Sequence, residues 1–404
     1  MIKILLLAIL FYSCENKEEV LNKGKSVYLP PSFFEDKVDP CSSKDFNILI
    51  KNRCELHKIK SSYLKNKKEF FETPFSKELH ISLAKHYPID LFYFLDQKGF
   101  LDRLDHEHLF SEGIKGQNSE LIHFLMEKKE SLYVLLFNDL NYSKMKFIDE
   151  FIKRGTLSAS KMVQTENGVE FPLLWLAKTS YKNFNYSDQE LFKELVRLIM
   201  SKVTNNLQWE FEDKKSNNLL HLCAKSDNDY LAAEVIEKFP YLLRQLNSKG
   251  RTPIHISLYN NAEFFYETVK DRFQAQDLLI EDYFQESPLE LMVKFSRLKF
   301  LKLAFDNEQQ ELLRTHRDSR GRNLLHLATI YGKVRMAFEL ARIGVNPKEK
   351  DLLGRDAEYF ATEGAKRYPF MGKNFEKLLR LFKIVKEHGH DTLSDDDADA
   401  LLKG

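Results

Sequence analysis

The chain has 404 residues, of which 43% are hydrophobic and 30% are charged, a globular composition long enough for two compact domains or one elongated array. Lys and Arg number 61 against 60 Asp and Glu, so no overall charge directs the chain toward nucleic acid or an anionic membrane. We therefore expect no nucleic-acid partner.

The first residues have the pattern of an export signal. A positively charged start precedes an apolar run over residues 4–12, which is too short to cross a bilayer because about 20 residues are needed. Ser13 then stands directly before Cys14, and a polar stretch follows. This arrangement resembles a bacterial lipoprotein signal, which implies that residues 1–13 are removed and that Cys14 carries a lipid anchor to a membrane. An ordinary cleaved signal peptide and a cytoplasmic chain are the alternatives.

Residues 14–69 are predicted to form a tether, because they contain several prolines and few helical signals. Cys41 and Cys54 lie within it, and in an oxidising compartment a disulfide between them would contribute about 3 kcal/mol of stability. Two unpaired thiols are the alternative. Cys223 occupies a position that favours a buried core thiol. No His or Cys spacing typical of a metal site is present, so we expect no metal and no cofactor.

Residues 70–205 alternate amphipathic helical runs with short polar breaks, which predicts degenerate helix-pair repeats. The expected pairs are 79–85 with 90–97, 109–114 with 119–128, and 132–139 with 144–153. A fourth unit begins at Pro172, and an insertion is expected after it, over residues 180–187. Its aromatic residues either form a binding lip or fold back on the neighbouring helices.

The stretch from Asn247 to His255 combines a turn with a helix start. Gly250 suits the left-handed conformation of a tight turn, Thr252 can cap a helix, and Pro253 fits the first helical residue. His255 then faces inward on the first turn, where a neutral imidazole accepts at one nitrogen and donates from the other, so it can connect its own turn to a neighbouring one.

This pattern recurs at a nearly constant spacing. The position of His255 is filled in the other copies by His221, Glu290, His326 and Tyr359, so the steps are 34, 35, 36 and 33 residues. The copies resemble the ankyrin signature Thr-Pro-Leu-His, which is preceded by a turn glycine such as Gly250 or Gly321 and repeats about every 33 residues. The resemblance implies an all-α ankyrin-repeat solenoid of stacked helix pairs over residues 206–388, ending in a C-terminal cap.

The remaining residues, 389–404, are predicted to be a frayed acidic tail because they contain Asp395, Asp396 and Asp397 in a row. No catalytic motif is present: the chain has no phosphate-binding glycine loop, no nucleophile elbow and no metalloprotease helix. The cluster from Asp105 to His108 is interpreted as a solvated turn. We therefore predict that the protein is not an enzyme.

A repeat array offers an extended concave surface formed by turn tips and first helices, where a partner protein is expected. The predicted partner-binding residues are basic residues near the turns, which would attract an acidic partner: Lys249, Arg251, Arg320, Arg322 and Arg355. The predicted function is a non-catalytic protein-binding scaffold tethered in a bacterial cell envelope. One alternative is a secreted effector that acts on host or prey proteins, and another is an enzyme with an unrecognised site in the N-terminal half.

Overall fold

The computed structural model describes residues 39–66, 75–129, 131–165, 168–203, 206–304 and 310–403. The chain forms two compact units, Met1–Tyr87 and Pro88–Gly404. The predicted signal peptide over residues 1–13 and the predicted lipidation site Cys14 lie outside the described residues. In the described part of the chain, no helix combines the length and the apolar character needed to cross a membrane.

The first unit contains a small helical module where a tether was predicted. Its elements are η3 (Pro40–Ser42), α2 (Phe46–Lys51), α3 (Leu56–Lys65) and α5 (Lys77–His86). The prediction of a tether over residues 14–69 is therefore wrong for the described residues 39–66. The physical reason is that α2 buries Phe46, Leu49 and Ile50 completely, which gives this short segment an apolar core of its own.

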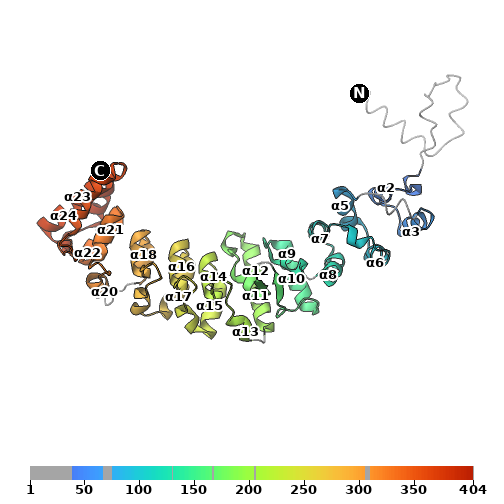
Figure 1. Ribbon diagram of the computed structural model, residues 1–404, viewed down its shortest axis with the longest axis horizontal. Coiled ribbons are helices and arrows are strands. Elements are labelled where there is room, and N and C mark those ends of the chain that lie inside the picture. The colour runs from blue at the N-terminus through green and yellow to red at the C-terminus, as the bar shows by residue number, and fades with distance from the viewer. Residues whose placement is uncertain are drawn as a thin grey trace, which may run out of the picture. The chain divides into compact units, whose positions relative to one another are not determined.

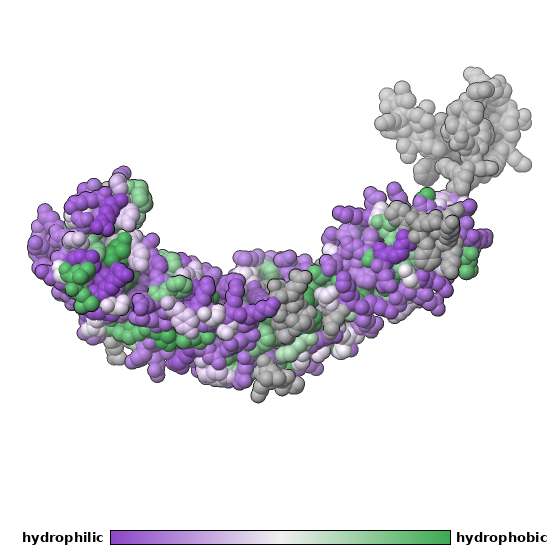
Figure 2. All heavy atoms as spheres, viewed as in Figure 1, coloured by the Kyte–Doolittle hydropathy of each residue, from purple (hydrophilic) through white to green (hydrophobic). Residues whose placement is uncertain are grey.

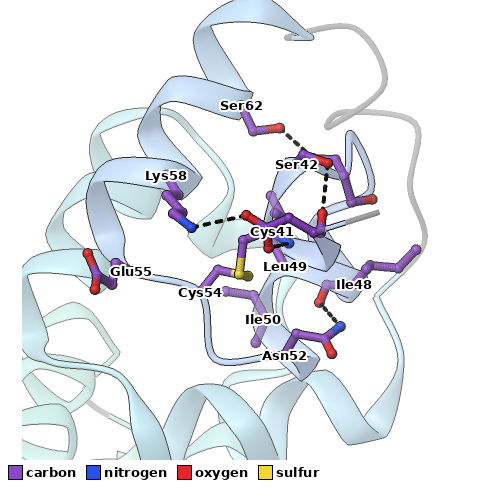
Figure 3. Close-up of a disulfide and its surroundings, with 12 residues drawn as sticks. Cys41, Ser42, Ile48, Leu49, Ile50, Asn52, Cys54, Glu55, Lys58 and Ser62 are labelled. Atoms are coloured by element: carbon purple, nitrogen blue, oxygen red, sulfur yellow. Dashed lines mark hydrogen bonds and ion pairs between the residues drawn. A yellow bond between two sulfur atoms is a disulfide. The ribbon is translucent and has the colours of Figure 1, made fainter. Parts of the chain in front are cut away.

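Cys41 and Cys54 form a disulfide that joins η3 to the start of α3 (Figure 3). Two polar contacts lie beside it: Lys58 is 3.1 Å from Asp39, and the Ser62 hydroxyl donates to the carbonyl of Ser43 at 2.8 Å. The disulfide closes a loop with a sequence separation of 13 residues. Such a bond stabilises mainly by restricting the unfolded chain, by about 3 kcal/mol for a loop of this size.

The second unit begins with the degenerate repeats, drawn in cyan to green in Figure 1. Their elements are α6 (Ile89–Gln97), α7 (His106–Lys115), α8 (Ser119–Lys128), α9 (Leu132–Phe137), α10 (Tyr142–Arg154), β1 (Val163–Thr165), β2 (Gly168–Glu170), α11 (Pro172–Ala177), α12 (Tyr186–Lys202) and α13 (Asn206–Trp209). The two short strands pair as an antiparallel hairpin, with Val163 opposite Glu170.

The regular repeats follow in the same unit. Their helices are α14 (Leu219–Ser226), α15 (Asp229–Lys238), α16 (Pro253–Asn260), α17 (Glu263–Val269), α18 (Pro288–Lys294), α19 (Leu298–Ala304), α20 (Gln310–Thr315), α21 (Leu324–Ile330), α22 (Val334–Ile343), α23 (Ala357–Arg367), α24 (Gly372–His388) and α25 (Asp395–Lys403). Apart from the small hairpin, the described residues of this unit form an all-α solenoid of the ankyrin type, as predicted.

The helices of this unit form two rows. The first helices contact one another in the order α14, α16, α18, α21 and α23, and the second helices α15, α17 and α19 do the same. Figure 1 shows α14 above α15 and α16 above α17. Each first helix therefore packs against a helix on either side, which explains why residues 219–224 of α14 are all buried rather than apolar on one face alone.

The predicted insertion over residues 180–187 has a different form from the one expected. Tyr181 is only 1% exposed and stacks on Phe192 with ring centroids 4.9 Å apart, so this ring folds back on the neighbouring helix. The helix α12 already begins at Tyr186 and has 17 residues, whereas α15 has 10. Most of the extra length between the fourth and fifth units therefore lies in a longer second helix. The local sequence pattern did not show whether these residues form a helix or a loop.

The prediction of a frayed acidic tail is also wrong. Residues 395–403 form α25, which contacts α22 and α24. Leu393, Ala398 and Leu401 are all less than 10% exposed, so the acidic segment carries an apolar face that covers the end of the repeat array. Ser394 caps this helix by accepting from the backbone amide of Asp397 at 3.2 Å.

Candidate functional site

Five turn tips share one backbone geometry. They comprise residues 213–217, 247–251, 282–286, 318–322 and 351–355. In each tip the amide of the first residue donates to the carbonyl of the fifth at 2.9 or 3.0 Å. The fourth residue is left-handed, with φ between +54° and +74°. Glycine fills this position in three tips, as Gly250, Gly321 and Gly354.

The first residue of each tip also stabilises the turn through its side chain. In every tip the Oδ1 atom of an Asp or Asn accepts from the amides of the third and fifth residues. In Asp351, for example, Oδ1 accepts from the amides of Leu353 and Arg355, both at 2.9 Å. These carboxylates therefore belong to the fold and are not presented to a ligand.

Backbone hydrogen bonds connect most neighbouring tips. The amide of Tyr283 donates to the carbonyl of Lys249 at 3.1 Å, and the amide of Leu352 donates to the carbonyl of Arg320 at the same distance. The amide of Ser248 likewise donates to the carbonyl of Lys215 at 2.9 Å. The tips therefore form a continuous ridge at these junctions.

In three of the five copies, a buried histidine connects the helix start to the next repeat. In the second copy, Nδ1 of His255 accepts from the backbone amide of Thr252 at 3.1 Å and lies 2.8 Å from its hydroxyl. Nε2 donates to the carbonyl of Glu286, the last residue of the following tip, at 3.2 Å. His221 and His326 donate in the same way to the carbonyls of Arg251 and Arg355, at 2.8 and 3.1 Å.

The environment of these histidines favours the neutral imidazole. Burial lowers the pKa of His221 and of His255 to about 4, because a charged ring is poorly solvated between two first helices. Burial also lowers the pKa of His326. The three side chains are structural, and their period reflects the spacing of the stack rather than a catalytic constellation.

The seventh unit replaces the histidine by Glu290. Its Oε2 accepts from the backbone amide of Ser287 at 3.2 Å, so the cap is kept. A carboxylate cannot donate onward to a carbonyl, and instead Nε2 of His316 lies 3.2 Å from Oε1 of Glu290. In the described structure no backbone bond connects the tip of this unit to the tip that follows it. This junction is therefore built differently from the others.

Three of the five predicted partner-binding residues are engaged within the chain. Arg251 pairs with Asp282 at 2.9 Å, Arg322 with Asp318 at 2.6 Å and Arg355 with Asp351 at 2.6 Å. The charge of these arginines is therefore already matched within the chain, and their role toward a partner stays a prediction. Each guanidinium is matched by a carboxylate that is less than 10% exposed.

Arg251 contacts one carboxylate and two aromatic rings. Its side chain is 14% exposed, and its partner Asp282 is fully buried. Burial acts to raise the pKa of Asp282, but Arg251 and two backbone amides outweigh it and hold the pKa below the usual range. The guanidinium also lies 4.1 Å from the ring centroid of Tyr259 and 5.4 Å from that of Phe284. Arg251 thus fixes the positions of two aromatic rings.

The two other predicted residues do face solvent. Lys249 and Arg320, each the third residue of its tip, are exposed and form no ion pair within the described part of the chain. Sequence reasoning missed the side chains that accompany them on the ridge. Tyr283 and Phe284 are 72% and 63% exposed, and Leu352 and Leu353 are 76% and 73% exposed. The available signal was the presence of bulky apolar residues at turn positions that are normally polar.

A hollow of about 870 Å³ lies beside the first of these tips, between α11 and α14. Leu174, Leu222 and Phe211 contribute apolar surface to it, and Lys215 and Lys225 contribute charge. Glu170 also lines it and is paired with Lys178 at 3.0 Å. On the face of the second unit that Figure 2 shows, small hydrophobic patches lie among hydrophilic residues.

The degenerate half contains a smaller hollow, two of whose lining residues contact acidic residues on their own helices. Its hollow of about 330 Å³ is lined by Glu120, His123 and Arg154 among others. Arg154 is paired with Glu150 on its own helix at 2.7 Å, and His123 faces Glu127 on its own helix at 3.6 Å. Across the described residues, no three His, Cys, Asp or Glu side chains are arranged to hold a metal ion.

The cluster from Asp105 to His108 is a helix start. Asp105 accepts from the amides of Glu107 and His108 at 3.1 and 3.0 Å, which caps α7. His106 contacts the carbonyl of Leu101 through Nε2 at 2.8 Å. The side chains of Asp105 and His106 therefore serve local structure.

The tips, the helix caps and the bridging histidines recur together at the spacing read from the sequence. The repeats are ankyrin-like. No protein-family model matches the chain, and no curated protein matches it. Among solved structures it is similar to the ankyrin repeat domain of Bcl-3, described as a unique member of the IkappaB protein family, at 15% identity and a TM-score of 0.41. The match covers 57% of this chain and 92% of that chain.

The contrast between Arg251 and Arg320 generates a prediction. Arg251→Ala leaves the carboxylate of Asp282 buried without its guanidinium, and we expect the free energy of unfolding to fall by about 2 kcal/mol. Arg320→Ala is the matched control, since it removes an exposed arginine from the neighbouring region and should change stability by less than about 0.5 kcal/mol. Urea denaturation followed by circular dichroism measures both. Equal losses would show that the ion pair has no structural role.

Proposed function

We propose that the chain is a non-catalytic scaffold that binds another protein along its turn tips. The supporting observation is that different positions of each tip form the turn and face solvent. The first, fourth and fifth residues form the turn, whereas the side chains of the second and third residues, such as Lys249 and Phe284, face solvent. Side chains that the fold does not require are available for recognition.

The size of this ridge favours a macromolecular partner. Packed helices lie roughly 10 Å apart, so five consecutive tips extend over about 40 Å. A small molecule is usually enclosed by a single cleft, whereas a partner protein can contact several tips at once. The buried histidines support a non-catalytic role, because both ring nitrogens of His255 are already used in structural contacts.

We also propose that the protein is tethered in a bacterial cell envelope through a lipid on Cys14. The support comes from the apolar run over residues 4–12, the Ser13-Cys14 pair and the Cys41–Cys54 disulfide. Disulfides persist mainly in oxidising compartments outside the cytoplasm. Several acyl chains together would provide a stable anchor, whereas one chain gives only marginal binding.

The lipid anchor is tested by metabolic labelling of cells with a fatty-acid probe. We expect labelled protein in the membrane fraction, and we expect globomycin, which blocks lipoprotein signal cleavage, to leave a longer precursor. Cys14→Ser should abolish both the label and the sensitivity to globomycin. An unlabelled protein recovered in the medium would favour the secreted effector instead.

Binding along the tips is tested by photocrosslinking in the native envelope. A photoreactive amino acid replaces Ser248 or Ser319, which are exposed second residues of two tips. The matched control carries it at Lys383, whose side chain is 73% exposed on α24. We expect the same protein to be crosslinked from both tips and not from α24, because only the tips face the partner.

A partner crosslinked equally well from Lys383 would contradict the assignment of the binding surface. Crosslinking from neither tip, together with normal folding of the variants, would contradict a tip-bound partner altogether.

A further inference from the structure

The exposed tip positions share a chemical character. The second and third residues of the five tips are all exposed, and together they comprise four cations, four bulky apolar residues and two serines, with no carboxylate. In chain order these residues are Lys214, Lys215, Ser248, Lys249, Tyr283, Phe284, Ser319, Arg320, Leu352 and Leu353. Four of the five acidic residues of the tips lie at the first position, where backbone amides satisfy them, and the fifth, Glu286, pairs with Lys294.

One side chain of each apolar pair is held by the neighbouring tip. A Cβ added at Gly250 would lie 2.6 Å from the ring of Tyr283, so this ring rests directly on the glycine. A Cβ added at Gly321 would lie 3.0 Å from Cγ of Leu352. Both side chains nevertheless remain more than 70% exposed. Their partial fixation reduces the entropy that is lost when a partner binds.

Phe284 is fixed in another way. The guanidinium of Arg251 lies 5.4 Å from its ring centroid and is itself held by Asp282 at 2.9 Å. The ring is still 63% exposed. Exposed aromatic side chains that are already positioned are the usual anchors of protein interfaces.

Cations stand on either side of these anchors. Lys215 and Lys249 precede Phe284 at the third position, and Arg320 lies between Phe284 and Leu353. None of the three cations forms an ion pair in the described structure. A partner with basic or neutral side chains would leave these charges uncompensated, whereas an acidic partner would match them.

We propose that the ridge recognises an acidic protein segment that carries bulky apolar side chains, with its carboxylates beside Lys215, Lys249 and Arg320 and its apolar groups on the Tyr283–Phe284 and Leu352–Leu353 pairs. This inference rests on the proposed function and names the class of partner for the same surface. The two apolar pairs lie two repeats apart, or roughly 20 Å, which corresponds to about 13 residues of a partner helix.

An anionic membrane is the main competing ligand, and the ridge fits it less well. The four cations of the tips would together contribute only about 4 kcal/mol at an anionic surface. Tyr283 and Leu352 also lie against the neighbouring tips rather than projecting together as an insertion loop would. A nucleic acid is disfavoured because bases could stack on Tyr283 and Phe284 but would find no stacking surface at Leu352 and Leu353.

The test is a selection of random displayed peptides of about 20 residues, long enough to span both apolar pairs as a helix or as an extended chain. The full chain is immobilised as bait. We expect the enriched peptides to carry net negative charge and at least two bulky apolar residues. The affinity of a representative peptide is then measured by fluorescence anisotropy, with vesicles of phosphatidylglycerol tested in parallel.

Two pairs of double variants make the test specific. Tyr283→Ser with Phe284→Ser should weaken peptide binding by about tenfold or more, whereas Tyr186→Ser with Phe370→Ser removes the same residue types at sites 81% and 83% exposed outside the tips and should have no effect. Lys249→Glu with Arg320→Glu should likewise weaken binding, whereas Lys373→Glu with Arg380→Glu reverses two exposed charges on α24 and should not. Urea denaturation verifies that each variant folds.

Several outcomes overturn the inference. These are no enrichment, enrichment of basic or uncharged peptides, equal effects of tip and control variants, or binding to the vesicles in place of peptides. A partner crosslinked from Ser248 and Ser319 combined with any of these results would show that the scaffold function holds and that only the partner class is wrong. Failure of both experiments would remove the proposed function as well.

Discussion

The structure depends on a single side chain that serves two repeats at once. In the regular copies the third residue of the first helix accepts a hydrogen bond from its own helix cap and donates one to the last carbonyl of the next tip. First helices of seven or eight residues, such as α16 and α18, are too short to be stable alone in water. They persist because each is capped, packed on both sides and joined to the next turn.

This arrangement separates the residues that stabilise the fold from those that we propose to bind a partner. The inside of each tip is occupied by a side chain such as Asp282 or Asp351, which the turn requires. The second and third residues are left to vary, and here they hold lysines, an arginine and apolar pairs. The junction at Glu290 departs from this pattern. Glu290 still accepts from the helix cap at Ser287, but its other carboxylate oxygen contacts His316 instead of a donor reaching the next tip.

Much of the fold was predictable from the sequence because caps and turns are local. Gly250, Thr252 and Pro253 mark a helix start within nine residues, and the period reveals the stack. The ion pair of Arg251 was not predictable, since its carboxylate lies 31 positions away, whereas Arg322 and Arg355 pair within their own tips, four positions away. The helix α25 was not predicted, because the sequence of this segment is dominated by acidic residues although Ala398 and Leu401 form a buried apolar face. Contacts between segments that are distant in the sequence therefore decided the cases of Arg251 and α25.

The most direct test of the bridging role is a ¹⁵N NMR titration of the imidazole of His255, assigned by the loss of its signals in His255→Gln. At pH 7 we expect the neutral tautomer with the proton on Nε2, because Nδ1 accepts from Thr252 and Nε2 donates to the carbonyl of Glu286. The ring should stay neutral until the pH approaches its lowered pKa of about 4. In the unfolded chain histidine binds its proton near pH 6.5, so this interaction should stabilise the fold fully above that pH and lose its contribution between about pH 6.5 and 4. A ring protonated near pH 6.5, or a proton on Nδ1 at pH 7, would contradict the account.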